Sequence, residues 1–303
     1  MNSVNKVWVN VEGRRLSLSN LDKVLYPKHG FAKGEVIDYY TRIAAVLLPH
    51  LIARPATRKR FPNGVDAEFF FEKNAPSHTP EWVRVATLPT PGGRHETLDY
   101  VVVDDLPTLV WCANLAALEL HVPQWRIGQK DQVRNADLLV FDLDPGPPAT
   151  YVESCRVACL LRDLLSADGL EVYPKTSGKK GLHLYVPIAE TAPDRTSAYA
   201  KAAAERLAAE HRDLVVSRMD KRLRKGKVFV DWSQNNGAKT TVAPYSLRAA
   251  DEPAVSTPVT WDEVDGCTEV PLFEPADVLA RVERDGDLLA PLLTDDRHRL
   301  PPG

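Results

Sequence analysis

One segment of this sequence sets tight limits on the fold, because it is apolar along its length yet carries two acids near its end. Leu138-Leu139-Val140-Phe141-Asp142-Leu143-Asp144-Pro145 is typical of a buried strand, and Pro145-Gly146 ends it. Side chains alternate between the faces of a strand, so Asp142 and Asp144 lie on one face, with Cα atoms roughly 7 Å apart. Two like charges on an apolar strand are poorly tolerated without a cation, so the pair predicts a hard divalent metal ion. The alternative is an ordinary pair of acids at a sheet edge.

A second apolar strand, Val228-Phe229-Val230-Asp231-Trp232, presents a third carboxylate at its end. Three carboxylates on neighbouring strands can hold two metal ions about 3.5–4 Å apart, an arrangement used in phosphoryl and nucleotidyl transfer. The alternative is that Asp231 only caps its strand. Asp142, Asp144 and Asp231 are therefore the predicted catalytic and metal-binding residues, with Mn²⁺ or Mg²⁺ as two bound ions.

Between the two acid-bearing strands lies a loop rich in glycine and cations, Ser177-Gly178-Lys179-Lys180-Gly181-Leu182-His183. Its glycines let the backbone approach an anion, and its lysines and histidine add donors, as a triphosphate cradle requires. The spacing is not that of a P-loop, and a basic hairpin turn is the alternative. Polar and cationic groups that follow Asp231 are expected to complete the cradle: Gln234, Lys239 and Arg248.

Strands outnumber helices in the centre of the chain without strict alternation, which predicts an α+β fold with a mixed or antiparallel sheet flanked by helices. A hairpin is expected around Glu12-Gly13. The other predicted strands are 57–61, 69–73, 97–103, 138–143, 170–175, 182–187, 227–232 and 240–243. Helices are predicted over 33–48, 106–118, 151–165, 193–211 and 275–284. We expect one domain, 1–303, with a basic N-terminal part (1–60), a catalytic core (97–250) and an acidic helical part (251–303).

The net charge of −3 conceals an uneven distribution. Residues 1–60 hold 11 Lys or Arg against 4 Asp or Glu, whereas residues 251–303 hold 4 against 13. A second basic cluster, 218–227, includes Arg222 and Arg224. Clustered cations suit contacts to a phosphate backbone, although each cluster alone is equally consistent with a solvated face.

Aromatic and basic residues in the first part of the chain also favour a nucleic-acid substrate. In Phe69-Phe70-Phe71 neighbouring rings fall on opposite faces of a strand, so at least one ring can stack on a base, although a single Phe is more often core. Lys23 and Lys33 lie beside predicted turns, where they can hold a terminal phosphate. Taken singly, they are ordinary surface lysines.

The composition is that of a globular protein, with 44% hydrophobic and 26% charged residues in 303. No stretch of the sequence approaches the length of about 18 apolar residues that a membrane-spanning helix needs. No apolar core of a signal peptide follows the first residues. We therefore expect a soluble cytoplasmic protein with no membrane partner. The four cysteines form no zinc-type pair and are read as reduced core thiols: Cys112, Cys155, Cys159 and Cys267.

Several motifs together resemble the polymerase domain of the bacterial end-joining DNA ligase, a member of the archaeo-eukaryotic primase superfamily. They cover nearly the whole chain in the expected order: Asp22–Pro27, Arg54–Arg60, His121–Trp125, Phe141–Pro145, Thr176–His183, Val228–Trp232 and Pro244–Arg248. The resemblance implies a primase-like fold and a template-dependent enzyme that adds NTPs or dNTPs to a primer 3′-OH at gaps and broken ends, with manganese often favoured. It also implies a nucleoid-associated bacterial protein that acts in end joining or gap filling.

The resemblance implies a role for each matching position. Asp142 and Asp144 would bind both metals, and Asp231 the catalytic one. Ser177, Lys180, His183 and Arg248 would hold the triphosphate, Phe71 with Phe70 behind it would stack on the base, and His121 would lie beside the sugar. The DNA, a gapped or 3′-overhang duplex, would be gripped at its 5′-phosphate by Lys23 and Lys33, and its template strand would pass Arg60.

Two departures and two rival functions accompany the resemblance. Lys179 stands where members of that family commonly carry a small polar residue, and the segment Arg126–Asp137 is short for the family. No ligase or nuclease sequence follows Pro301, so a stand-alone gap-filling relative is an alternative, and Ku and a DNA ligase are possible partners. The rivals are a DNA-end-bridging module without catalysis, and a haloacid-dehalogenase-type phosphatase, which expects threonine where Gly146 stands.

Overall fold

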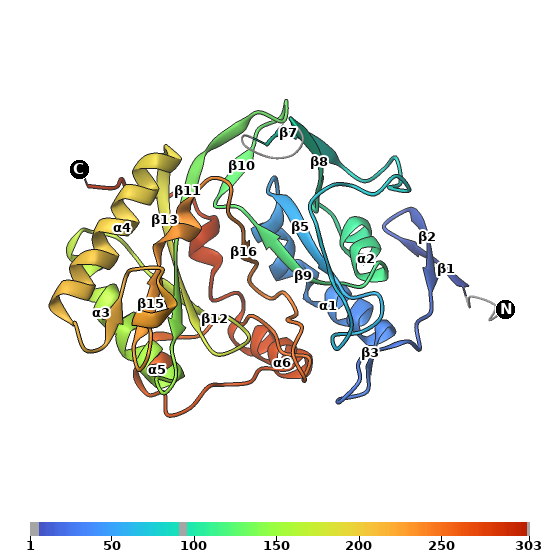
Figure 1. Ribbon diagram of the computed structural model, residues 1–303. Helices are drawn as coiled ribbons and strands as arrows, with labels where there is room; N and C mark the ends of the chain where they lie inside the picture. Colours follow the sequence, from blue (N-terminus) through green and yellow to red (C-terminus); the bar gives the residue numbers. More distant parts are fainter. Residues whose placement is uncertain (1–5, 91–95, 302–303) are drawn as a thin grey trace.

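The computed structural model describes residues 6–90 and 96–301, shown as a ribbon in Figure 1. The first five and the last two residues lie outside the described residues. They belong to the predicted basic and acidic parts, and the first five also hold most of the chain start in which no signal core was found. Within the described part, the strands form two six-stranded sheets and two small two-stranded ones. The pairings between these strands are antiparallel except that of β14 (Val215–Val216) with β15 (Val228–Asp231). The predicted α+β class with a mixed sheet is confirmed.

The N-terminal region forms the predicted hairpin and then a long helix. β1 (Lys6–Val11) and β2 (Arg14–Ser19) are joined at Glu12 and Gly13, whose φ angles are +46° and +81°. A short pair, β3 (Val24–Tyr26) and β4 (Phe31–Ala32), leads into α1 (Lys33–Leu51). The apolar face of α1 belongs to the first hydrophobic core, as its sequence periodicity predicts.

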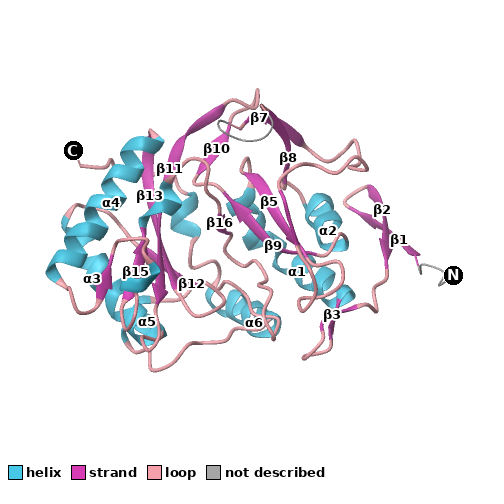
Figure 2. Ribbon diagram, viewed as in Figure 1, coloured by secondary structure: helices cyan, strands magenta, loops and turns pink. Residues whose placement is uncertain are grey.

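The first sheet has the strand order β16-β9-β5-β8-β7, with β6 paired to β5. Its strands are β5 (Pro55–Arg60), β6 (Phe70–Glu72), β7 (Val85–Pro89), β8 (Thr97–Val102), β9 (Ala117–Val122) and β16 (Thr241–Val242). Helices α1 and α2 (Leu106–Asn114) pack beside it, and α6 (Pro275–Asp285) packs on α1 (Figure 2).

The helix predicted over 106–118 is too long. α2 ends at Asn114, and Ala116 has a φ of +56°, which no helix continues. The chain then enters strand β9, whose alternation of Leu118 and Leu120 with Glu119 and His121 carries the strand period. The apolar residues at its start extend the helical pattern, which is why the boundary is misplaced.

The second sheet has the order β12-β13-β11-β15-β14, with β10 (Trp125–Ile127) paired to β11. β11 (Val133–Pro145) is its central strand, flanked by β13 (Leu182–Thr191) and β15; β12 (Tyr173–Thr176) starts three residues later than predicted. Helices α3 (Tyr151–Ala167) and α4 (Pro193–Glu210) pack on this sheet in a second core, and the short α5 (Trp261–Asp265) packs on α3. Thr150 and Glu153 form a capping box at the start of α3.

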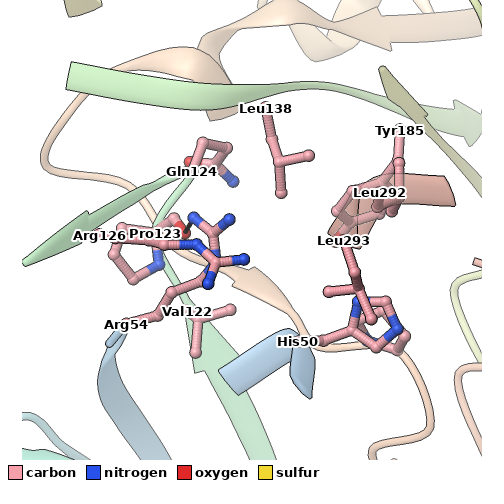
Figure 3. A pocket seen from close by; sticks show the side chains of 11 residues that line it. His50, Arg54, Val122, Pro123, Gln124, Arg126, Leu138, Tyr185, Leu292 and Leu293 are labelled. Atoms are coloured by element: carbon pink, nitrogen blue, oxygen red, sulfur yellow. Dashed lines mark hydrogen bonds between the residues drawn. The ribbon is translucent and has the colours of Figure 1, made fainter. Parts of the chain in front are cut away.

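A buried ion pair joins the two halves of the molecule. Arg54, before β5, donates two hydrogen bonds of 2.7 and 2.8 Å to Asp137 on β11, and Arg126 donates a third at 3.0 Å. Arg54 and Arg126 border a small cavity of about 20 Å³, which Figure 3 shows with Arg54, Gln124 and Leu138 around it. That volume holds about one water molecule. The cavity therefore belongs to the joint between the halves and has no room for a substrate.

Two further expectations concern the cysteines and the membrane. All four thiols are free, as predicted; Cys112 and Cys155 are buried, while Cys159 and Cys267 are only partly so. Across residues 6–90 and 96–301, no helix combines the length and the apolar character needed to span a bilayer.

Candidate active site

The three predicted carboxylates meet on neighbouring strands of the second sheet. Asp142 on β11 is the direct cross-strand partner of Asp231 on β15, and Asp144 lies two residues farther along β11. The burial along 141–145 alternates, with both acids more exposed than the apolar residues beside them. The two acids of β11 and Asp231 therefore face the same side of the sheet, away from the apolar face that packs on α3 and α4.

The pKa shifts of the carboxylates indicate that a bound cation would stabilise their ionised forms. Burial alone raises the pKa of Asp142, but the neighbouring His183 ring and Lys175 outweigh it and hold the pKa below its ordinary range. Burial and the charge of Asp142 raise the pKa of Asp144. Burial and a like charge both disfavour the ionised form of Asp144, whereas a divalent cation bound beside it would favour that form, and carboxylate oxygens are the donors such ions prefer. The residues present thus fit the divalent metal ions that the sequence pattern predicts.

Asp231 also organises the turn that follows it, η2 (Trp232–Asn235). Its Oδ1 accepts hydrogen bonds from the backbone N–H and Oγ of Ser233, at 2.9 and 2.6 Å, and its Oδ2 accepts from Gln234 at 3.1 Å. Gln234 is therefore held at the carboxylates. Lys239 lies farther along, where it lines an open cleft of about 650 Å³ together with Tyr100 and Trp125.

The glycine- and lysine-rich loop folds back onto the end of β11. The Oγ of Ser177 accepts the backbone N–H groups of Lys179 and Gly181, at 3.3 and 3.1 Å, and so closes the turn. The Nζ of Lys180 donates to the carbonyl of Pro145, at 3.2 Å, one residue beyond Asp144. The loop cations thus lie beside the carboxylates, as a phosphate cradle requires.

Gly178 allows Arg248 to lie against this loop. Its φ is +69°, and a Cβ there would lie 2.4 Å from the Cγ of Arg248. Any side chain would therefore displace Arg248. Since Arg248 follows β16 in the chain, this contact brings the far part of the sequence to the loop between β12 and β13.

His183 completes the group at the carboxylates. It is the cross-strand partner of Asp142, its Nε2 lies 3.3 Å from Oδ1 of Asp142, and its side chain is buried. Burial and the nearby Lys175 lower the pKa of His183 to about 4, so the ring is neutral at physiological pH. Lys175 and its contacts were not anticipated from the sequence.

A buried carboxylate that the sequence reading missed, Glu119 on β9, gathers the groups predicted to hold the nucleotide. It lies 2.9 Å from His121, 3.3 Å from Arg248 and 3.6 Å from Lys59, and its Oε1 accepts the N–H of Ala249 at 3.1 Å. Burial opposes ionisation, but these partners, His121 first, hold the pKa of Glu119 far below its usual range. The signal was present as an acid in the alternating segment 117–122, whose first two residues were read as the end of a helix.

The phenylalanine run is not core. Phe69, Phe70 and Phe71 are each about half exposed, at 49, 52 and 51%. The reading of a single Phe as more often buried is therefore wrong here, and the stacking alternative gains support. Phe71 lies with its ring 5.6 Å from that of His121, whereas Phe69 packs on Phe61. Phe71 thus lies against His121, which Glu119 links to Arg248.

The two lysines expected at the DNA 5′-phosphate lie together near the start of α1. The backbone N–H of Lys33 donates to the carbonyl of Lys23 at 2.9 Å, and the Lys33 Nζ donates to the carbonyl of Ser19 at 2.6 Å. Burial and the charges of Lys23 and Arg60 lower the pKa of Lys33 to about 8. Arg60, at the end of β5, pairs with Glu72 at 2.8 Å and lies close enough to Lys33 for its charge to act on that amine.

The second basic cluster separates into two kinds of residue. Arg224 stacks 3.7 Å over the ring of Phe229 and lies 3.9 Å from Asp144, so it belongs to the carboxylate group. Arg222 is 89% exposed and binds Asp220 in its own turn. The structure therefore brings Arg224, and not Arg222, to the carboxylates.

Comparisons with known proteins agree with this geometry. Residues 32–289 match the family model described as LigD, primase-polymerase domain. The multifunctional non-homologous end joining protein LigD of Mycolicibacterium smegmatis is 48% identical over 289 residues, which are 95% of this chain and 37% of that protein. The bifunctional non-homologous end joining protein LigD of Bacillus subtilis is 32% identical over 274 residues, covering 90% of this chain and 43% of that protein. The chain thus spans less than half the length of these relatives.

A solved structure matches over nearly the whole chain. It is the polymerase domain from Mycobacterium tuberculosis Ligase D in complex with DNA, with a TM-score of 0.88, 46% identity, and coverage of 95% of this chain and 99% of that one. This structural match and the family match both agree with the geometry of the carboxylates and of the glycine- and lysine-rich loop. The chain belongs to the LigD primase-polymerase domain family and is therefore a nucleotidyltransferase.

Proposed function

We propose that this protein is a template-dependent primase-polymerase that adds NTPs or dNTPs to a primer 3′-OH at DNA gaps and double-strand-break ends. The observation that carries the proposal is the convergence of Asp142, Asp144 and Asp231 beside the Ser177–His183 loop. Carboxylates without phosphate-binding groups would only hold a metal, and the loop without carboxylates would only bind an anion. Together they suit transfer of a nucleotidyl group.

Asp142 and Asp144 would hold two divalent ions, Mn²⁺ or Mg²⁺, and Asp231 would bind the catalytic one. Such ions lower the pKa of an attacking hydroxyl and neutralise charge on phosphate. Ser177, Lys180, His183 and Arg248 would orient the triphosphate, so that its α-phosphate lies near the primer 3′-OH and pyrophosphate leaves in line. The rate of nucleotidyl transfer would then depend mainly on how well the triphosphate and the primer 3′-OH are positioned.

The nucleoside would occupy the space bordered by Phe71 and His121. A half-exposed ring suits stacking on a base, with Phe70 behind it, and His121, whose ring contacts that of Phe71, would lie beside the sugar. Gln234 and Lys239 would bound the pocket on the side of Asp231. Glu119 would hold His121 and Arg248 in place without touching the nucleotide.

The DNA would be a gapped or 3′-overhang duplex whose 5′-phosphate is bound by Lys23 and Lys33, with Arg60, Arg222 and Arg224 near the template strand. The DNA complex of the Mycobacterium tuberculosis domain supports a DNA substrate. The names of the relatives support a role in non-homologous end joining. Ku and a DNA ligase would be its partners. We further propose that residues 1–303 act as one primase-polymerase domain, because Arg54 and Asp137 bind its two sheets together. Family membership rules out the haloacid-dehalogenase-type phosphatase.

The test is single-nucleotide extension on a short gapped duplex with Mn²⁺ or Mg²⁺, comparing NTP with dNTP and a 5′-phosphate with a 5′-hydroxyl. We expect template-directed addition that is stronger on the phosphorylated gap and absent in Asp142→Ala/Asp144→Ala. The double variant should still bind the gapped DNA, because these side chains act through metal ions. Binding that depends on the 5′-phosphate without any extension would contradict the proposal and indicate a DNA-end-bridging module.

A further inference from the structure

Four polar residues form a continuous row across the second sheet. Lys175 on β12 is the cross-strand partner of His183 on β13, His183 is that of Asp142 on β11, and Asp142 is that of Asp231 on β15. Cross-strand partners point to the same face of a sheet, so the four side chains stand side by side. Three of them belong to the proposed active site. Lys175, at the end of the row, has no role in the function described so far.

Lys175 is fully buried, and its head group has only neutral hydrogen-bond partners. Its Nζ lies 3.0 Å from Nδ1 of His183 and donates to Oγ of Ser256 at 2.5 Å. Ser256 in turn donates to the carbonyl of Thr176 at 2.7 Å, which fixes the direction of its own hydroxyl. A lysine amine donates readily, and Ser256 anchors it. The Nζ is therefore held as a donor aimed at the histidine ring.

The two sides of the His183 ring select the same tautomer. Its Nε2 faces the carboxylate of Asp142 at 3.3 Å, and a lone pair at Nε2 would repel that carboxylate, so Nε2 carries the proton. A neutral imidazole has one N–H, so Nδ1 is then an acceptor. That is the form that accepts a hydrogen bond from Lys175. A ring turned over, or carrying its proton on Nδ1, would lose both contacts.

We propose that Lys175 is a positioning residue that locks His183 in the Nε2–H tautomer and in one ring orientation, with its proton directed at the metal-binding carboxylate and the polyphosphate. Ser256 holds Lys175 in place for this purpose. A metal-ligating histidine commonly has its second nitrogen fixed by a partner, and such partners contribute 10–100-fold in metal affinity or activity; His183 lies directly beside a proposed metal ligand. Here the partner is a buried lysine, which fixes the tautomer by donating to Nδ1. The role of Lys175 in catalysis rests on the proposed function, whereas the assignment of the His183 tautomer is independent of it.

The direct test is the tautomer of His183 in solution. Protein labelled with ¹⁵N-histidine is examined by long-range ¹H–¹⁵N correlation, and the His183 signals are assigned among the eight histidines by their loss in His183→Gln. Wild type should show a protonated Nε2 and an unprotonated Nδ1. In Lys175→Met, of similar length but without a donor, we expect exchange between tautomers or a changed Nδ1 shift. Lys130→Met, at an exposed turn between β10 and β11, is the matched control and should leave the signals unchanged.

Kinetics give the second readout. Lys175→Met should lose about 10–100-fold in kcat/KM for extension and require more divalent metal, with a thermal unfolding midpoint showing that it is folded. If burial makes this variant unstable, Ser256→Ala retains the lysine and should show the same changes to a smaller degree. A folded Lys175→Met with wild-type tautomer and kinetics, or a wild type with the proton on Nδ1, overturns the inference. Because the tautomer is measured without catalysis, an inactive wild type would overturn the proposed function alone.

Discussion

Asp142 and Asp231 face each other directly across β11 and β15, although 88 residues separate them in the chain. The pairing is fixed by the register of two apolar strands, because a slip of one residue would turn one acid toward the core formed with α3 and α4. The carboxylates therefore depend on the packing of the sheet for their position. That makes their substitution a test of chemistry more than of folding.

Asp231→Asn should reduce primer extension by more than about 100-fold, because the amide keeps the shape of the side chain but provides weaker metal binding, and even indirect partners of a metal cost 10–100-fold. Asn retains an oxygen that accepts the hydrogen bonds of Ser233, so the η2 turn should persist. The measurements are extension rates at increasing Mn²⁺ and the affinity for gapped DNA. Asp251→Asn, at an exposed position, is the control. Parallel loss of DNA binding would show that the site itself had unfolded.

Phe71→Ala should weaken nucleotide use without destabilising the protein. The ring is half exposed, so little apolar burial is lost, while stacking on a base contributes about 1–3 kcal/mol. That energy corresponds to a rise of roughly 5- to 150-fold in KM for the nucleotide, and Phe71→Trp should restore most of it. Trp8→Ala removes an equally exposed ring on the N-terminal hairpin and should leave KM unchanged. An unaltered KM in Phe71→Ala would remove this ring from the nucleotide site.

Glu119→Gln should affect both stability and nucleotide binding, because Lys59 and Arg248 lose their shared counter-charge. Removing one partner of a fully buried ion pair costs about 3–5 kcal/mol, and less is expected here since both cations keep some solvent contact. A rise in the nucleotide KM should accompany the lower urea midpoint, as His121 and Arg248 are released. Glu283→Gln, exposed on α6, is the control. Full stability in Glu119→Gln would mean that the cations find other partners.

The parts of the site that could be predicted share a local signal. Asp142, Asp144 and Asp231 interrupt apolar strands, and the loop from Ser177 to His183 concentrates glycine and lysine, so each is visible in a short window of sequence. The same holds for the hairpin at Glu12-Gly13 and for the long helices, whose periodicity repeats over several turns. Family resemblance then assigned roles that spacing alone left open.

The parts that were missed depend on contacts between distant segments. Glu119 and Lys175 are single charged residues inside apolar strands, and their partners Arg248 and Ser256 lie more than 80 residues away. No local pattern reveals such a pairing. Strand β9 was missed for a related reason, because a left-handed residue at Ala116 ends α2 where the composition still favours a helix. In each of these cases contacts between distant segments, and not the local sequence, determine the structure.

The pH dependence of 5′-phosphate recognition tests the two lysines. Burial and the charges of Lys23 and Arg60 lower the pKa of Lys33 to about 8, so this ammonium is charged below that pH and neutral above it. A terminal phosphate keeps its full charge above pH 7, since its second pKa is about 6. The preference for a 5′-phosphate over a 5′-hydroxyl should therefore be largest near pH 7 and fall as the pH rises through 8 toward 9.5.

Two variants define the origin of this dependence. Lys33→Gln has no titrating amine at this position and should show a small preference that stays constant with pH. Lys23→Ala removes a neighbouring positive charge, which raises the pKa of Lys33 and should move the midpoint to higher pH. Bound phosphate shifts the midpoint in the same direction, so values measured on DNA should lie at or above 8. A preference that grows between pH 7 and 9.5, or that keeps its pH dependence in Lys33→Gln, would assign the 5′-phosphate to other residues.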